Sequence, residues 1–146
     1  MINVSTDGEE LMPIWQKFKK AGKKAGCVTT VPITHATPAG FTVSMKSRND
    51  QSAIAEEYLK IGYDVLMGGG NKYFDAASRK DKKDMYAAFT EKGYNVVKTK
   101  SELKNIDYSK PVLGVFDEDA LPYAIDRKNS TELTNKIPTL AEMAQV

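Results

Sequence analysis

The sequence predicts one α/β domain over residues 1–146, with a parallel-rich sheet of about four strands flanked by helices. Short aliphatic runs typical of buried strands alternate along the chain with segments whose apolar residues recur at helical spacing. Glycines and polar turns separate these segments, and no internal repeat or low-complexity tract interrupts them. Because strand–helix–strand units pair their strands in parallel, this alternation favours a parallel-rich α/β sandwich.

Four short apolar runs predict the strands. They are residues 28–31, 64–67, 94–97 and 112–116. Pro32 follows the first run and is expected to end it, since proline lacks the amide hydrogen that a sheet needs. Three glycines follow the second run, but their spacing to Lys72 fails the phosphate-loop pattern. We therefore expect a tight turn there, where two backbones approach closely.

Apolar residues at helical spacing and capping residues predict the helices. They are 13–25 closed by Gly26, a segment opened by Thr37, a segment capped by Asn49 or Asp50 that ends at Gly62, 84–92, and a segment opened by Pro138 and Thr139. We interpret Thr37 and Pro38 as the N-cap and first helical residue, because a threonine oxygen accepts a free amide hydrogen and proline loses no bond there. Residues 75–84 are expected to form an exposed polar loop, and 126–136 a polar linker.

Composition is that of an ordinary globular protein, with 41% hydrophobic and 27% charged residues. A net charge of +2 gives no electrostatic reason to expect a nucleic-acid partner. No apolar window is long enough to predict a membrane span, and the first residues do not resemble a signal peptide. The single cysteine excludes an internal disulfide and says little about compartment.

Residues 27–49 contain the groups best suited to chemistry. His35, the only histidine, lies in the loop after a predicted strand, where open α/β sheets bind their ligands. Thr37 opens a helix whose N-terminal end favours anions. Arg48 could donate two parallel hydrogen bonds to a phosphate or carboxylate. Each also has an ordinary structural explanation, as a solvated imidazole, a helix cap and a solvent-facing arginine, so none predicts a function alone.

Taken together, the string VTTVPITHATPAGFTVSMKSRN at residues 28–49 resembles the alkaline phosphatase family, in which T-H/D-A-T-P-A is followed by S-R. Three later blocks resemble the family in the same order. They are DVLMGGGNKYF at 64–74, KPVLGVFDEDALPYAIDR at 110–127 and IPTLAEMAQV at 137–146. On these four ordered blocks the chain is identified as a member of that family.

The resemblance implies a role for each matching residue. Thr37 matches the hydroxyl that ligates the family's Mg²⁺, and His35 matches a position, Asp or His in different members, that reaches the same metal through water. Arg48 matches the arginine that holds the substrate phosphate with two hydrogen bonds. The implied activity is hydrolysis of phosphate monoesters through a phosphoseryl intermediate, with two Zn²⁺ and one Mg²⁺ in the intact enzyme. Because imidazole suits zinc better than magnesium, His35 also implies an altered metal preference.

Two parts of the family pattern are not found. No D-S-A-like motif with the nucleophilic serine occurs between Met1 and Cys27, and the E-G-x-x-I-D-x-x-x-H block that supplies zinc ligands is missing. One histidine and one cysteine cannot form two zinc sites. We therefore expect an internal fragment of an alkaline phosphatase, with no catalytic nucleophile and no activity alone. The resemblance implies an extracytoplasmic parent, periplasmic or secreted.

An alternative is a non-catalytic α/β binding or assembly domain, in which Thr37 and His35 are structural and Arg48 pairs with a carboxylate. A flank cut from a larger sheet would also leave an open edge and an uncovered apolar face. We therefore expect the chain to self-associate at high concentration.

Overall fold

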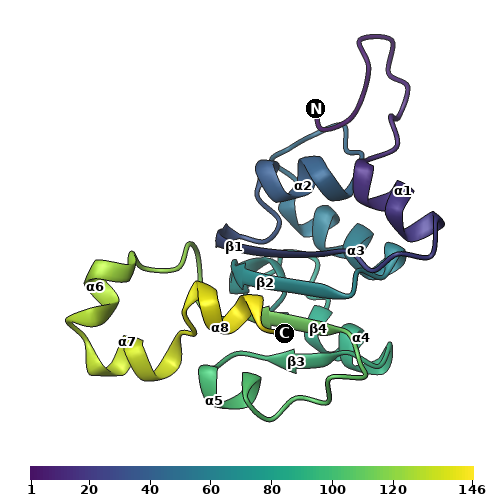
Figure 1. Cartoon of the computed structure of the whole chain (residues 1–146). Coiled ribbons are helices and arrows are strands. Elements are labelled where there is room, and N and C mark those ends of the chain that lie inside the picture. The colour runs from purple at the N-terminus through teal and green to yellow at the C-terminus, as the bar shows by residue number, and fades with distance from the viewer.

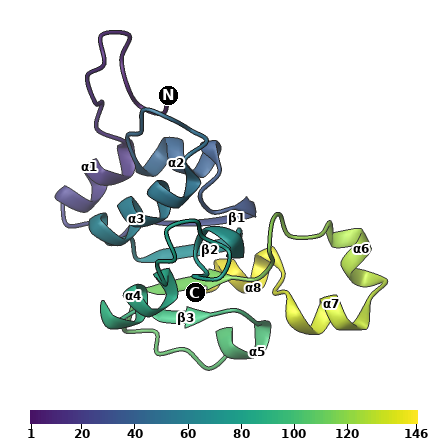
Figure 2. The same ribbon diagram turned by 180° about the vertical axis from the view of Figure 1, so that it is seen from behind.

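The computed structural model describes all 146 residues, which form a four-stranded parallel sheet with helices on both faces (Figures 1 and 2). The strands are β1 (Gly26–Pro32), β2 (Val65–Gly69), β3 (Asn95–Val97) and β4 (Val112–Val115). Their order across the sheet is β1-β2-β4-β3, and all three pairings are parallel. The predicted parallel-rich α/β fold is therefore confirmed.

Eight α-helices and one 3₁₀ helix connect and cover the strands. They are α1 (Ile14–Lys20), α2 (Ala36–Thr42), α3 (Gln51–Ile61), η1 (Asn71–Tyr73), α4 (Met85–Glu91), α5 (Lys100–Leu103), α6 (Ala124–Lys128), α7 (Thr131–Lys136) and α8 (Leu140–Ala144). Asp50 caps α3, Asp84 caps α4 and Thr139 caps α8, each by accepting a backbone amide hydrogen. The predicted starts of these three helices are confirmed.

The core has two parts because the sheet is covered on both faces. Helices α3 and α4 lie against one face, and α5 and α8 against the other (Figures 1 and 2). Successive residues of β2 alternate between them: Leu66 packs with the α3–α4 side and Met67 with the α5–α8 side. Both side chains are fully buried. The central strand therefore has no solvated face, which explains its continuous apolar sequence.

The predicted helix over 13–25 is wrong at its C-terminal end. Helix α1 ends at Lys20, and Gly22 adopts a left-handed conformation with φ +73°. Gly26 does not close the helix but begins β1, where an added Cβ would lie 2.6 Å from the Cβ of Val65. The glycine is needed for close pairing of two strands. Ile14 and Phe18, two apolar residues of this helix, are about half exposed.

The predicted linker over 126–136 is also wrong, since α6 and α7 occupy most of it. Hydrogen bonds between the two helices, and from α6 to the segment after α7, stabilise these short helices. Arg127 Nη1 donates to the Pro138 carbonyl at 2.7 Å, and the Thr134 hydroxyl donates to the Arg127 carbonyl at 2.7 Å. Helices of this length do not form from propensity alone, so a polar local sequence could not reveal them.

Gly68 and Gly69 end β2 rather than follow it, and only Gly70 lies in the expected tight turn at the carboxyl end of the sheet. An added Cβ on Gly69 would lie 1.8 Å from the Asp119 carbonyl oxygen, and Gly70 has φ +102°. The amides of Gly70 and Asn71 both donate to the Asp117 carbonyl, at 3.1 and 3.0 Å. The turn after β2 is thereby joined to the segment that follows β4.

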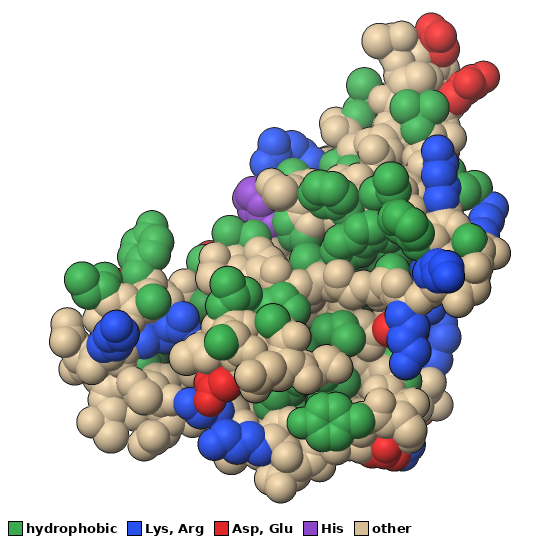
Figure 3. All heavy atoms as spheres, in the orientation of Figure 1, with side chains coloured by type: hydrophobic (Ala, Val, Ile, Leu, Met, Phe, Trp, Pro, Cys, Tyr) green, Lys and Arg blue, Asp and Glu red, His purple; other side chains and the backbone are tan.

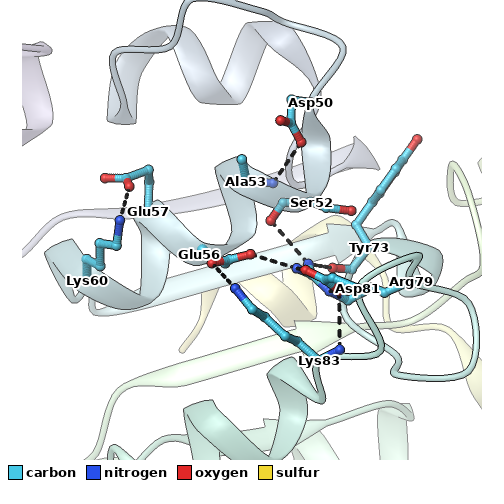
Figure 4. A network of polar contacts seen from close by, with 10 residues as sticks. All are labelled: Asp50, Ser52, Ala53, Glu56, Glu57, Lys60, Tyr73, Arg79, Asp81 and Lys83. Carbon is cyan, nitrogen blue, oxygen red and sulfur yellow. Dashed lines mark hydrogen bonds and ion pairs between the residues drawn. The ribbon is translucent and has the colours of Figure 1, made fainter.

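Residues 75–84 are not simply an exposed loop, because Arg79 has no exposed side-chain surface. All five donor hydrogens of its guanidinium are used (Figure 4). They bind both carboxylate oxygens of Asp81, at 2.8 and 2.6 Å, Glu56 at 2.8 Å, and the carbonyls of Ser52 and Tyr73 at 3.1 and 2.7 Å. Burial of a charge requires this compensation. The loop, α3 and η1 are thus joined at one cation.

The hydrogen bonds from Arg79 lower the pKa of the Asp81 carboxyl from its ordinary value of 3.8 to about 2. Because the pKa is lower in the folded state, this pair stabilises the fold above about pH 4 and is lost as the pH falls toward 2. We expect Asp81→Asn to lower the urea midpoint at pH 7 and to weaken the dependence of stability on pH between about 4 and 2.

Asp7→Asn, an exposed carboxylate of the N-terminal segment, is the control and should leave the midpoint unchanged. Urea unfolding followed by circular dichroism at several pH values measures both effects. An Asp81→Asn midpoint equal to the wild-type value at pH 7 would contradict the assignment.

Candidate functional site

The loop with His35 and Thr37 lies at the carboxyl end of the sheet, directly after β1. The Ile33 amide donates to the Gly69 carbonyl at 3.1 Å, and the Tyr58 hydroxyl donates to the Ile33 carbonyl at 2.8 Å. These bonds join the loop to β2 and to the middle of α3. The loop is therefore held at the edge where parallel α/β sheets bind their ligands.

The predicted start of α2 is wrong by two residues. His35 is the N-cap, α2 begins at Ala36, and Thr37 and Pro38 are its second and third residues. The first intrahelical bond is from the Ala39 amide to the His35 carbonyl, at 3.0 Å. Proline costs no bond at the third position, because the first three helical amides have no acceptor within the helix. Thr37 is exposed, and its hydroxyl makes no capping bond.

His35 is half-buried, and its Nδ1 atom is buried without any hydrogen-bond partner. Buried polar atoms are nearly always paired, so an unpaired one calls for an explanation such as an ion or a bound water. The neutral imidazole could accept a hydrogen bond from a metal-bound water or bind a metal directly. The imidazole and the free Thr37 hydroxyl are each of a type that can serve in a metal site. No three His, Cys, Asp or Glu side chains gather where they could hold a metal by themselves.

Arg48 lies in the exposed turn that leads into α3. Its guanidinium makes no ion pair and no side-chain hydrogen bond, so it has no carboxylate partner. The Asp50 carboxylate accepts from the Ala53 amide at 3.1 Å and fixes the exit of this turn. Arg48 therefore keeps all its donors free, as a residue that binds an anion would.

The segments with His35 and Arg48 are joined through their neighbours. The Thr34 hydroxyl donates to Gln51 Oε1 at 2.9 Å, and Gln51 Nε2 donates to the Tyr73 hydroxyl at 2.8 Å. No hydrogen bond joins His35, Thr37 and Arg48 to one another. The structure thus brings the two segments together but leaves the three predicted side chains unpaired.

Sequence reasoning missed Thr34, Gln51, Tyr73 and Arg79 as parts of this region. Gln51 is simply the first residue of a helix, and Arg79 lies in a strongly polar segment. No local pattern distinguishes such residues from solvated ones, because Thr34 binds Gln51 at 17 residues, Gln51 binds Tyr73 at 22, and Arg79 reaches back 27 residues to Ser52.

An open pocket of about 500 Å³ lies beside the first turn of α3. Its lining is almost entirely polar and includes Asn49, the residue after Arg48. Lys72, Tyr73 and Lys80 form part of the opposite wall.

None of the helices is long and apolar enough to cross a membrane.

The family model of alkaline phosphatases matches residues 1–146. Alkaline phosphatase 3 of Bacillus subtilis is 39% identical over 97% of this chain and 30% of its own length. Alkaline phosphatase 4 of the same organism is 35% identical over the same shares. The chain therefore spans about 30% of the length of these curated relatives.

Solved structures of alkaline phosphatases share the fold. The enzyme of Thermus thermophilus superposes with a TM-score of 0.90 at 45% identity, over 99% of this chain and 30% of its own. The cold-active enzyme of a Shewanella species gives 0.81 at 34%, over 99% and 32%. The Antarctic TAB5 enzyme with a histidine replaced by aspartate, solved with Mg bound in its M3 site, gives 0.77 at 26%, over 99% and 40%. With a family match along its whole length and these shared folds, the chain belongs to the alkaline phosphatase family.

Proposed function

We propose that this chain contributes the phosphate-holding arginine and part of the magnesium site of an alkaline phosphatase, and that the complete enzyme hydrolyses phosphate monoesters. The observation that carries the proposal is the unpaired, buried Nδ1 of His35 at the carboxyl end of β1. It occurs in a chain that the family model matches throughout.

Arg48 would hold the substrate. A guanidinium donates two parallel hydrogen bonds to the non-bridging oxygens of a phosphate and offsets the negative charge on the transferring group. The free donors and the exposure of Arg48 support this role. The polar pocket lined by Asn49 lies beside the turn that carries Arg48, although Arg48, His35 and Thr37 are not part of its lining.

Thr37 and His35 would hold Mg²⁺, Thr37 through its hydroxyl and His35 through a bound water. A bound Mg²⁺ would supply an acidified water beside the phosphate. The exposed Thr37 hydroxyl, free of capping, supports the first assignment, and the unpaired His35 nitrogen supports the second. The ligands of the two Zn²⁺ ions and the nucleophilic serine would be supplied by other segments of the complete enzyme, since this chain spans about 30% of the length of its relatives. The family resemblance also leads us to place the complete enzyme outside the cytoplasm, periplasmic or secreted.

The first experiment measures binding of orthophosphate by the 146-residue chain in an NMR titration. We expect Arg48→Ala to weaken binding by about tenfold or more, the effect of losing charge-assisted hydrogen bonds. Arg48→Lys should recover only part, because an ammonium lacks the planar fork. Lys46→Ala removes a nearby exposed positive charge and is the matched control.

The same chain should not hydrolyse a chromogenic phosphate monoester above a metal-only blank at alkaline pH with Zn²⁺ and Mg²⁺. Turnover that disappears in Arg48→Ala would place a nucleophile within residues 1–146 and contradict our division of the site. Equal losses of phosphate binding in Lys46→Ala and Arg48→Ala would contradict a specific role for Arg48, since any positive charge in this turn would then have the same effect.

The second experiment exchanges His35 in the complete enzyme. We expect His35→Asp to raise the affinity for Mg²⁺ by about tenfold, because a carboxylate suits magnesium better than imidazole and outer ligands change metal affinity by such factors. The TAB5 structure with a histidine replaced by aspartate and Mg in its M3 site supports an exchange of this type. The Mg²⁺ dependence of activity measures the effect, and His35→Asn is the neutral control. Unchanged metal dependence in His35→Asp would remove the assignment.

An assembly role has one observation in its favour, an exposed apolar surface over α1 and α2 (Figure 3). Its large exposed side chains are Leu11, Met12, Ile14, Phe18 and Phe41. We expect dimers or larger species at high concentration by light scattering. The double variant Phe18→Ser and Phe41→Ser should restore the monomer, whereas Tyr123→Ser, which alters an exposed residue of the α6 region, should not. A wild-type mass that stays monomeric at every concentration would contradict self-association.

A further inference from the structure

We propose that Gln51 is a positioning residue, which holds the segment with Arg48 in a fixed relation to the loop with His35. It acts through Thr34 on one side and Tyr73 on the other. The expected effect of Gln51 on phosphate binding rests on the proposed function, since that effect concerns how the two binding segments are aligned. The hydrogen bonds themselves do not depend on that function.

Gln51 uses both ends of its amide. Its Oε1 accepts from the Thr34 hydroxyl at 2.9 Å, and its Nε2 donates to the Tyr73 hydroxyl at 2.8 Å. Thr34 is fully buried and directly precedes His35. Gln51 is the first residue of α3, three residues after Arg48. One side chain therefore links the neighbours of both predicted binding groups.

One partner of Gln51, Tyr73, is itself held by Arg79. The same guanidinium nitrogen, Nη1, donates to the carbonyls of Tyr73 and Ser52, the residue after Gln51 (Figure 4). Tyr73 is thus held through its backbone by Arg79 and offers its hydroxyl to Gln51. The first turn of α3 and η1 form one rigid frame to which Thr34 is attached.

No other side-chain hydrogen bond makes this link. Tyr58 also binds the loop, at the Ile33 carbonyl, but it lies two turns further along α3. The Asp50 carboxylate binds only within the first turn of α3, at the Ala53 amide. Loss of the Gln51 bonds would leave the loop attached to the middle of α3 and release it from the turn that carries Arg48.

Such a release matters because a two-pronged grip on phosphate depends on alignment. Displacement of a binding group by about 1 Å from its productive place weakens its interaction strongly. Gln51 need not touch the phosphate to affect its binding. Its role is to keep the donors of Arg48 at a set distance from the group that His35 binds.

The test uses three single variants of the 146-residue chain. Gln51→Met keeps the length of the side chain and removes both bonds, Tyr73→Phe removes one hydroxyl and keeps the carbonyl bond to Arg79, and Thr34→Val removes the other hydroxyl. We expect each to weaken orthophosphate binding by about fivefold, because loss of either bond is enough to interrupt the link that aligns Arg48. Because the three residues act in one chain of bonds, Thr34→Val should add little in the background of Gln51→Met.

The matched control is Tyr94→Phe, which removes a tyrosine hydroxyl bonded to the Tyr63 carbonyl near the amino end of β2. It should change the urea midpoint at least as much as Tyr73→Phe, yet leave phosphate binding at the wild-type value. Equal losses of phosphate affinity in Tyr73→Phe and Tyr94→Phe would overturn the proposal, since the effect would then be a general loosening of the fold.

A second readout does not need phosphate. Backbone ¹⁵N order parameters of residues 47–50 should fall in Gln51→Met, while those of residues 79–84 stay at wild-type values. If the wild-type chain binds no orthophosphate but the order parameters of residues 47–50 fall in Gln51→Met, the proposed function fails and the positioning role stands. Wild-type order parameters together with wild-type phosphate affinity in Gln51→Met would overturn the positioning role and leave the function of Arg48 intact.

Discussion

Arg79 carries a full positive charge on a side chain with no exposed surface. Such a charge costs several kcal/mol to bury unless every donor is matched. Here two carboxylates and two backbone carbonyls match all five. The carbonyls belong to Ser52 and Tyr73, so the arrangement that satisfies the charge also fixes where α3 begins and where η1 ends. The rest of the candidate site is attached to this frame.

The carboxyl edge of the sheet depends on a second constraint, the close approach of backbones. Gly69 leaves no space for a side chain beside the Asp119 carbonyl, and the Ile33 amide binds the Gly69 carbonyl from the other side. The loop after β1 and the segment after β4 are thereby brought to the same turn. A rigid edge of this kind suits groups that must be placed accurately and that contribute little to stability themselves.

The sequence predicts the elements whose signals are local. Runs such as Val65–Met67 are apolar enough to indicate a buried strand, and Asp50, Asp84 and Thr139 indicate helix starts. It fails where distant contacts decide. The polar segment around Arg79 gives no sign of burial, and α6 and α7 are joined to each other through Arg127 and Thr134 and to the following segment through Pro138. The assignments of His35, Thr37 and Arg48 come from the family resemblance, since each residue alone is compatible with an ordinary surface role.

The position of His35, and not Thr37, at the N-cap of α2 has a consequence for how the protein can change over evolutionary time. Thr37 is freed from capping, and Arg48 has no structural partner. Substitution at either place should therefore alter ligand preference with little effect on folding. Arg79, for which no contact with phosphate or metal is proposed, cannot be exchanged so easily, because even lysine lacks its five donors. If the proposed site is correct, selection for new chemistry and selection for a stable fold would act on different residues, so that ligand preference could change while the fold is kept.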